Sequence, residues 1–142
     1  MFQKIQHMGY LTPDLDAAIN WFEQSFGAVH GGGGTLPEGN YAVPSGGRNV
    51  YMKFGQAEAE IIEPQDKQRL SSELLAMHHV GYVVADIEHS MATLTAKGFK
   101  FAADKPFTNV VGQQVLYIDA SSTNGVLVHL TQLPVQPDTV AA

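Results

Sequence analysis

Apolar and polar residues follow two different periods along this chain, one typical of helices and one typical of strands. Two stretches place apolar side chains on one face of a helix: Leu15, Ala18, Ile19, Phe22 and Phe26, then Ile87, Met91 and Leu94. Asp14 and Asp86 stand where a helix cap is expected, and Gly27 and Gly98 stand where each helix would end. The pattern therefore predicts two short helices, one in each half of the chain.

Strand-like runs follow each predicted helix. Residues 50–54 and 57–63 are joined by the turn residues Gly55 and Gln56 in the first half. Residues 115–120 and 126–133 are joined by SSTNG in the second half. Both halves thus read as a strand, a helix and then several strands.

The halves also share a short motif. HMGY at residues 7–10 returns as HVGY at residues 79–82, so the repeat has a period of about 70 residues. We expect one domain over residues 1–142, made of a first module at about 3–63, a connector at 64–76, a second module at about 77–134 and a loose tail at 135–142. The connector is expected to hold one short helix at residues 72–75.

A glycine-rich segment at residues 30–49 interrupts the first half. Its length and composition are typical of a lid or a substrate loop. A phosphate-binding loop is disfavoured, because no Walker lysine follows at the required distance.

Composition excludes several classes of function. The chain has 142 residues, 44% of them hydrophobic and 15% charged, which is typical of a folded domain. Its net charge of −6 argues against nucleic acid or an anionic membrane as the partner. Without cysteine, disulfides and thiolate chemistry are excluded, and without a secretory signal or membrane span we expect a cytoplasmic protein.

Four polar residues occupy matching places in the two halves. Strand alternation places His7 on one face with Ile5 and Gly9, and the repeat places His79 in the equivalent position. Glu60 and His129 lie in the last strand of each half, each shortly before a proline. A buried hydrogen-bonded network of these side chains is one interpretation, but it leaves several polar groups competing for few partners. A divalent metal held by all four is the interpretation that we favour.

Other polar residues are weaker candidates than these four. His78 is adjacent to His79, but its equivalent in the first half is Gln6, so the repeat selects His79. His30 and His89 have no equivalents and are expected at the surface. Three cations, Arg48, Lys53 and Lys105, are candidate anchors for an anionic substrate group, although solvated surface charges are the simpler interpretation.

The chain resembles the vicinal oxygen chelate superfamily, which includes glyoxalase I, methylmalonyl-CoA epimerase, fosfomycin-resistance enzymes and extradiol dioxygenases. The resemblance rests on QHMGYLTPDLDAAINWF, AEIIEP, HHVGYVVADIEHSMATLTAKG and NGVLVHLTQLP, and it covers almost all of residues 5–134. The layout is most similar to the epimerase-like branch. The resemblance implies an α+β fold, with two tandem βαβββ modules that form a curved, partly closed mixed sheet around a metal site.

The resemblance also implies roles for single residues. His7, Glu60, His79 and His129 fall on the metal-ligand positions of the family, and His129 stands where glyoxalases and epimerases usually have glutamate. Tyr51 falls near a second acidic position of the epimerase motif, so both departures argue against methylmalonyl-CoA epimerase activity itself. The candidate catalytic residues are Glu60 and His129 as proton acceptors and Tyr51 as a proton donor.

Three classes of function remain open. The favoured class is an isomerase, epimerase or glyoxalase-type lyase that uses a divalent Ni, Co, Zn, Mn or Fe ion to move a proton next to a carbonyl. Its substrate would carry two adjacent oxygens, with an acyl-CoA as one candidate, and the protein would be a homodimer. The alternatives are an Fe(II)-dependent dioxygenase and a non-catalytic small-molecule binding or resistance protein.

Overall fold

A computed structural model describes residues 1–36, 46–68 and 70–135. The first half contains β1 (Phe2–Leu11), α1 (Leu15–Phe26), β2 (Val29–Thr35), β3 (Arg48–Phe54) and β4 (Ala57–Glu63). The second half contains β5 (Ala76–Val84), α2 (Ile87–Ala96), β6 (Phe107–Thr108), β7 (Gln114–Tyr117), the 3-10 helix η1 (Ala120–Ser122) and β8 (Val128–Gln132). The expected α+β class is confirmed.

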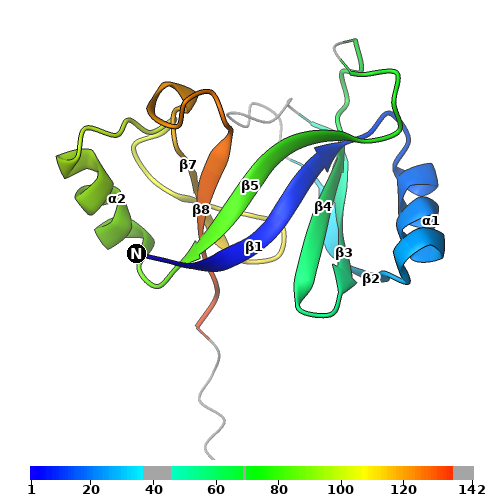
Figure 1. Ribbon diagram of the computed structural model, residues 1–142, viewed down its shortest axis with the longest axis horizontal. Helices are drawn as coiled ribbons and strands as arrows, with labels where there is room; N and C mark the ends of the chain where they lie inside the picture. Colours follow the sequence, from blue (N-terminus) through cyan, green and yellow to red (C-terminus); the bar gives the residue numbers. More distant parts are fainter. Residues whose placement is uncertain (37–45, 69, 136–142) are drawn as a thin grey trace, which may run out of the picture.

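The strands of both halves form one sheet. It has eight strands in the order β2-β3-β4-β1-β5-β8-β7-β6. At its centre β1 pairs antiparallel with β5, and each of these strands pairs in parallel with the last strand of its own half, β4 or β8. The sheet curls into a half-barrel with α1 and α2 at its two sides (Figure 1). The division into modules at residues 3–63 and 77–134 stays a prediction.

Both helix starts follow the expected capping chemistry. The carboxylate of Asp14 accepts a hydrogen bond from the backbone N–H of Ala17 at 3.0 Å, and that of Asp86 accepts one from His89 at 2.9 Å. Gly27 adopts the left-handed conformation with φ 64°, which lets its N–H reach back to Glu23. Both capping predictions are confirmed.

Each helix covers a separate apolar core on the outside of the sheet. Under α1, Leu15, Ala18 and Phe22 pack with strand residues of β3 and β4. Under α2, Ile87 and Leu94 pack with strand residues of β5, β7 and β8. Phe26, expected on the apolar face of α1, is instead 58% exposed. The inner face of the half-barrel carries polar groups beside a smaller apolar cluster of Ile62, Val115 and Tyr117.

Three expectations about connecting segments need correction. The glycine-rich segment at 30–49 is not a loop throughout, because residues 29–35 form β2 along the edge of the sheet, and residues 37–45 lie outside the described residues. Residues 72–75 contain bends and no helix. The run at 115–120 ends as a strand at Tyr117 and continues into η1. In the described part of the chain, no helix is long and apolar enough to cross a membrane.

Glycines in β2 allow the two ends of the sheet to meet. A methyl group placed on Gly32 would lie 2.8 Å from Val111 Cγ1, and one on Gly34 would lie 3.9 Å from Val110. Both valines belong to the turn between β6 and β7, at the opposite end of the strand order. The Asn109 amide nitrogen of the same turn lies 3.3 Å from the Tyr51 hydroxyl. The half-barrel is therefore closed at this point by contact between its first and second halves.

Candidate metal site

Two of the three register shifts between β1 and β5 lie beside the histidines and aim them inward. Along the β1–β5 ladder, Ile5 pairs with Tyr82 and His7 with Gly81, so Gln6 is an extra residue in β1. The expectation that His7 and Ile5 share a face is wrong for this reason, and Ile5 is 55% exposed. In β5, the step from Met77 to His79 spans a single step of β1, so His78 is the extra residue there. The two bulges occupy equivalent places just before each HxGY motif.

Glycines of the repeated motif lie between the polar residues. Gly9 pairs with Glu60 on one side and with His79 on the other, and Gly81 pairs with His7 and His129 in the same manner. A methyl group on Gly9 would overlap the His79 ring. One on Gly81 would lie 2.5 Å from His129 Cε1 and 2.8 Å from His7 Cε1. The repeated motif therefore has the same use in both halves. Each copy supplies one histidine, and its glycine leaves space for the histidine ring of the other copy.

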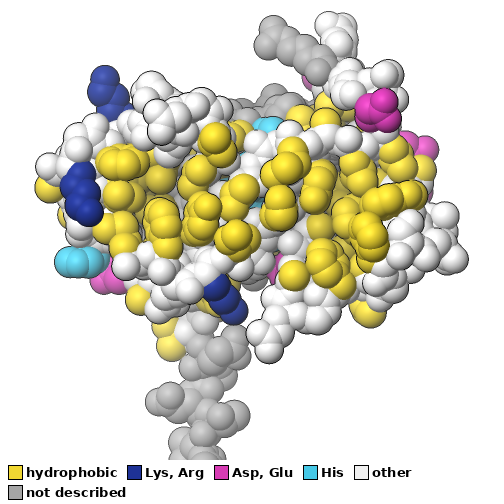
Figure 2. Space-filling model, in the orientation of Figure 1, with side chains coloured by type: hydrophobic (Ala, Val, Ile, Leu, Met, Phe, Trp, Pro, Cys, Tyr) yellow, Lys and Arg dark blue, Asp and Glu magenta, His cyan; other side chains and the backbone are white. Residues whose placement is uncertain are grey.

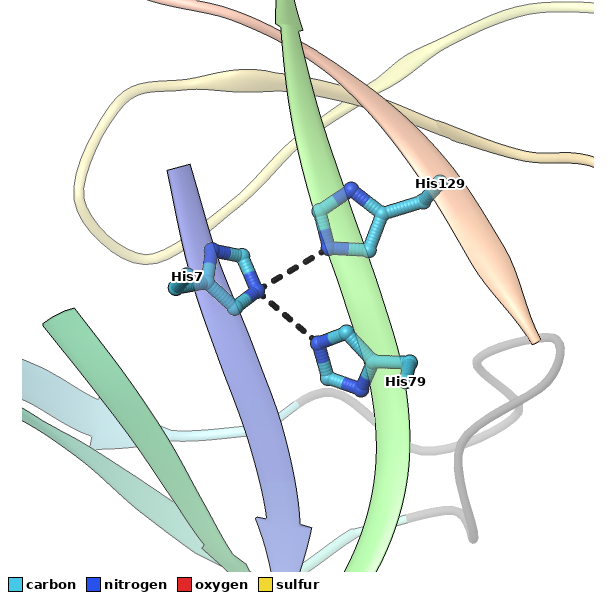
Figure 3. A group of neighbouring side chains, drawn as sticks. All are labelled: His7, His79 and His129. Carbon is cyan, nitrogen blue, oxygen red and sulfur yellow. Dashed lines mark hydrogen bonds between the residues drawn. The ribbon is translucent and has the colours of Figure 1, made fainter. Parts of the chain in front are cut away.

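Three histidines from β1, β5 and β8 point toward one another (Figure 3). His7 Nε2 lies 2.8 Å from His79 Nε2 and 3.1 Å from His129 Nε2. Glu60 Oε1 lies 3.1 Å from His79 Nε2 and 3.6 Å from His7 Nε2. All four side chains are buried, and each histidine is only 2% exposed. The structure thus brings the four predicted ligands together on the inner face.

The other ring nitrogen of each histidine has its own partner. His7 Nδ1 donates to the amide oxygen of Gln6, and His79 Nδ1 lies 2.8 Å from His78 Nδ1. His129 Nδ1 lies 2.9 Å from the Thr131 hydroxyl. Such contacts fix the ring orientation and leave Nε2 facing the centre. The two bulged residues are therefore part of the support for the histidines.

Burial favours the neutral form of His7 and His129. It lowers the pKa of His7 to about 4, although the Glu60 carboxylate works in the opposite direction. Burial likewise lowers the pKa of His129 well below its ordinary value. Neutral imidazole is the form that binds metals.

Glu60 stays ionised in the same surroundings. Burial would raise its pKa, but hydrogen bonds from His79 and Asn49 and the nearby imidazoles hold it below its ordinary value. The Asn49 amide donates to Glu60 Oε2 at 2.7 Å. The site therefore combines imidazole nitrogens from three histidines with one anionic oxygen.

These residues fit a divalent metal ion. Two ligands about 2.1 Å from one ion lie about 3 Å apart when they are neighbours at right angles. The separations of 2.8 and 3.1 Å between histidine nitrogens, and of 3.1 Å between His79 and Glu60, match that value. Without an ion, three nitrogens and a carboxylate would share few protons in a buried space. Nitrogen and carboxylate donors suit Zn, Ni, Co, Mn and Fe.

Two tyrosines flank the four residues symmetrically. Tyr51 pairs with Glu60 across β3 and β4, and Tyr117 pairs with His129 across β7 and β8. Burial raises the pKa of both phenols, and the Glu60 charge raises each further, so both stay protonated. Sequence reasoning proposed Tyr51 and missed Tyr117. Tyr51 and Tyr117 occupy equivalent positions in the strand pairing of the two halves. This equivalence could have identified Tyr117, but it is known only once the strands are paired.

The remaining candidates lie away from this centre. His30 and His89 are exposed, as expected. Arg48 binds Glu63 and Asp16, and Lys53 binds Glu58, so both cations are engaged in surface ion pairs. Lys105 is exposed.

A hollow of about 480 Å³ lies beside the site. It is lined by residues of β1 and of the β3–β4 hairpin, and His7 is one of them. Gln6 and Glu58, which are hydrogen-bonded to each other at 2.7 Å, also contribute to its walls. Most of the remaining lining is apolar, including Ile5 and Phe54.

Comparisons with known proteins agree with this architecture. The model of the glyoxalase/bleomycin resistance protein/dioxygenase superfamily matches residues 6–117. A mitochondrial methylmalonyl-CoA epimerase of Dictyostelium discoideum is 27% identical over 135 residues, which cover 91% of this chain and 78% of the relative. An ethylmalonyl-CoA/methylmalonyl-CoA epimerase of Cereibacter sphaeroides is 24% identical, and the match covers 94% of this chain and 100% of the relative.

Solved structures show the same fold. A Streptomyces coelicolor methylmalonyl-CoA epimerase variant, in complex with 2-nitronate-propionyl-CoA, superposes with a TM-score of 0.79. It is 20% identical in sequence, and the match covers 95% of this chain and 100% of that one. The expectation of an enzyme of the isomerase or epimerase type is supported by these relatives.

Proposed function

The chain belongs to the glyoxalase/bleomycin resistance protein/dioxygenase superfamily, and from this we propose that it is a divalent-metal-dependent isomerase or epimerase. The reaction that we propose is transfer of a proton next to a carbonyl group. The observation that carries the proposal is the cluster of three buried histidines whose ligand nitrogens lie within 4.8 Å of one another, with Glu60 Oε1 beside two of them. The epimerase relatives support the same class of reaction.

His7, Glu60, His79 and His129 would hold the metal. A divalent ion bound there supplies Lewis acidity, which favours loss of a proton next to a coordinated carbonyl. Its identity is open among Ni, Co, Zn, Mn and Fe, because the donor set suits all of them.

The proton-transfer roles fall to residues around this centre. Tyr51 is proposed as a donor, since it pairs with Glu60 across β3 and β4, and Tyr117, which pairs with His129, is its counterpart on the other side. Glu60 and His129 are the candidate acceptors. By the resemblance of the sequence, His129 falls on one acidic position of the epimerase motif and Tyr51 falls near another, so we propose a substrate of the acyl-CoA class without restricting it to methylmalonyl-CoA. The hollow beside His7 is where we place the rest of this substrate.

We further propose that the protein is a cytoplasmic homodimer. Hydrophobic side chains gather over the face shown in Figure 2, where β1 and β5 run between the two helices. Exposed apolar residues on these strands include Phe2, Ile5 and Met77. An apolar face of this kind favours contact with a partner, and a second copy would meet it with the same face.

Deuterium exchange tests the proposed reaction. The metal-loaded protein is incubated in D₂O with a set of acyl-CoA thioesters that carry a second carbonyl oxygen, and loss of the proton next to the carbonyl is followed by NMR. We expect exchange for at least one member of the set, and loss of exchange after metal removal. Glu60→Gln serves as the inactive variant, and His89→Gln, on the exposed face of α2, as the control.

The alternatives predict different outcomes. Oxygen uptake by the iron-loaded protein, with no deuterium exchange, would contradict proton transfer and favour a dioxygenase. Binding of small molecules by a protein that takes up no metal would favour the binding or resistance class.

A further inference from the structure

Asn49 is a buried residue of β3 whose side chain is engaged at both ends. It is 5% exposed. Its amide nitrogen donates to Glu60 Oε2 at 2.7 Å, and its amide oxygen accepts the backbone N–H of Gly34 at 3.0 Å. Because Gly34 lies in β2 and Glu60 in β4, Asn49 links its two neighbouring strands through its side chain.

This arrangement gives the two oxygens of Glu60 different partners. Oε1 faces His7 and His79, at 3.6 and 3.1 Å from their Nε2 atoms. Oε2 accepts the hydrogen bond from the Asn49 amide. A hydrogen bond from an amide to an ionised carboxylate in a buried place is stronger than one between neutral groups.

Movement of Glu60 would break that bond. A carboxylate that left the histidines to accept a proton would leave the Asn49 amide without its acceptor in a buried site. The backbone N–H of Gly34 holds the amide in place, so Asn49 cannot simply turn to follow the carboxylate.

We propose that Asn49 is a positioning residue that fixes the orientation of Glu60, so that Oε1 faces the histidines as a ligand. This inference rests on the proposed function, since it concerns the same metal site. It assigns a role to a residue that neither its position in the repeat nor its residue type indicates.

Asn49→Asp tests the proposal with almost no change in shape. The aspartate keeps an oxygen for the Gly34 N–H but replaces the amide that donates to Glu60. Asn109→Asp is the matched control, because it makes the same substitution and adds the same charge in the turn between β6 and β7. The Asn109 amide contacts Tyr51 and Gln113 rather than a proposed ligand. Asn49→Ser provides a second, uncharged variant if the aspartate prevents folding.

Two readouts are measured with Co²⁺ as the probe. The first is its dissociation constant, from competition with a chromophoric chelator, and the second is the visible absorption spectrum of the loaded protein. Loss of an outer partner of a ligand typically weakens metal binding about 10- to 100-fold. We expect that loss and an altered spectrum in Asn49→Asp and Asn49→Ser, with Asn109→Asp close to wild type.

Wild-type affinity and an unchanged spectrum in both Asn49 variants would overturn the role of Asn49 and leave the proposed function intact. If the wild-type protein itself failed to bind Co²⁺, the proposed metal site would be contradicted, and the role of Asn49 with it.

Discussion

Gly81 is the residue on which the arrangement of two proposed ligands depends. Its missing side chain leaves space for the rings of both His7 and His129. Distances below 3.0 Å from a Cβ atom require the neighbour to move, and both rings are tightly placed in the interior.

We predict that Gly81→Ala weakens metal binding at least about 10-fold, since two ligands are displaced together. Gly34→Ala is the control, because its methyl group would meet only Val110 at 3.9 Å. Metal affinity is measured by chelator competition. Equal affinity in the two variants would show that Gly81 does not set the position of the rings.

His7 makes the folding stability of the metal-free protein depend on pH. Its pKa is about 4 in the folded state and 6.5 in an unfolded chain. Between these values the unfolded chain binds a proton that the folded one does not, so stability falls as pH is lowered from 6.5 toward 4. The lowered pKa of His129 acts in the same direction.

We predict that His7 lowers the free energy of unfolding by up to about 3 kcal/mol across that range. A tenfold difference in proton affinity between the folded and unfolded states corresponds to about 1.4 kcal/mol. Urea unfolding of the apoprotein at a series of pH values measures it. His7→Gln should give a shallower dependence, whereas His89→Gln should match wild type. A flat profile for the wild-type apoprotein would contradict the buried, neutral state of His7.

At the residue scale, the sequence predicted the four clustered side chains better than the residues that contact them. His7, His79, Glu60 and His129 were predicted to lie together because they occupy matching places in the two halves of the sequence, and the structure brings them together. Their role as ligands stays a proposal. Asn49 was missed because its bond to Glu60 crosses between strands and follows no sequence period. The two bulges, at Gln6 and His78, shift the strand period by one residue, so strict alternation failed at Ile5.

Among the elements, β2 shows how a glycine run serves as a packing surface. Gly31 and Gly33 face the backbone of β3. Gly32 and Gly34 face the turn that carries Val110 and Val111. A methyl group on Gly32 would lie 2.8 Å from Val111 Cγ1 and would push this turn away from the sheet edge.

We predict that Gly32→Ala lowers the free energy of unfolding by about 1–3 kcal/mol, the usual cost of overpacking. Gly34→Ala, with its ordinary contact distance, should change it by less than about 0.5 kcal/mol. Denaturant unfolding of both variants provides the comparison. Similar stabilities would show that the turn adjusts freely to β2.

Elements with a clear period and end signal were predicted well. Both helices begin at a capping aspartate, and β3 and β4 join at Gly55 with φ 61°, as the turn residues indicated. The helix predicted at residues 72–75 was wrong, because two adjacent apolar residues are too few to show a helical period. Strand β2 was missed because glycine has no strand propensity, and its pairing with β3 determines its conformation.

For the whole molecule, the symmetric strand order is the main feature. It places strands β1 and β5 side by side at the centre, so the proposed ligands from both halves meet within one chain. The sequence alone left open whether the halves meet within a chain or across a dimer, because strand pairing between distant segments depends on tertiary contacts.

The outer face of the central strands has a separate consequence for assembly. We predict that the wild-type protein is a dimer in solution, and that Met77→Glu, at a residue 59% exposed on this face, shifts it to a monomer. Light scattering coupled to size-exclusion chromatography measures the mass. Val126→Glu is the control, because Val126 is 55% exposed in the loop before β8. A monomeric wild type would contradict the proposed dimer.

Metal content tests the central claim most directly. Wild type and His79→Ala are purified under anaerobic conditions, reloaded with Ni, Co, Zn, Mn or Fe, and analysed by elemental mass spectrometry. We predict about one divalent ion per chain in wild type, as expected for a single site, and its loss in His79→Ala. Wild-type protein that holds no metal after reloading would contradict the proposed metal site.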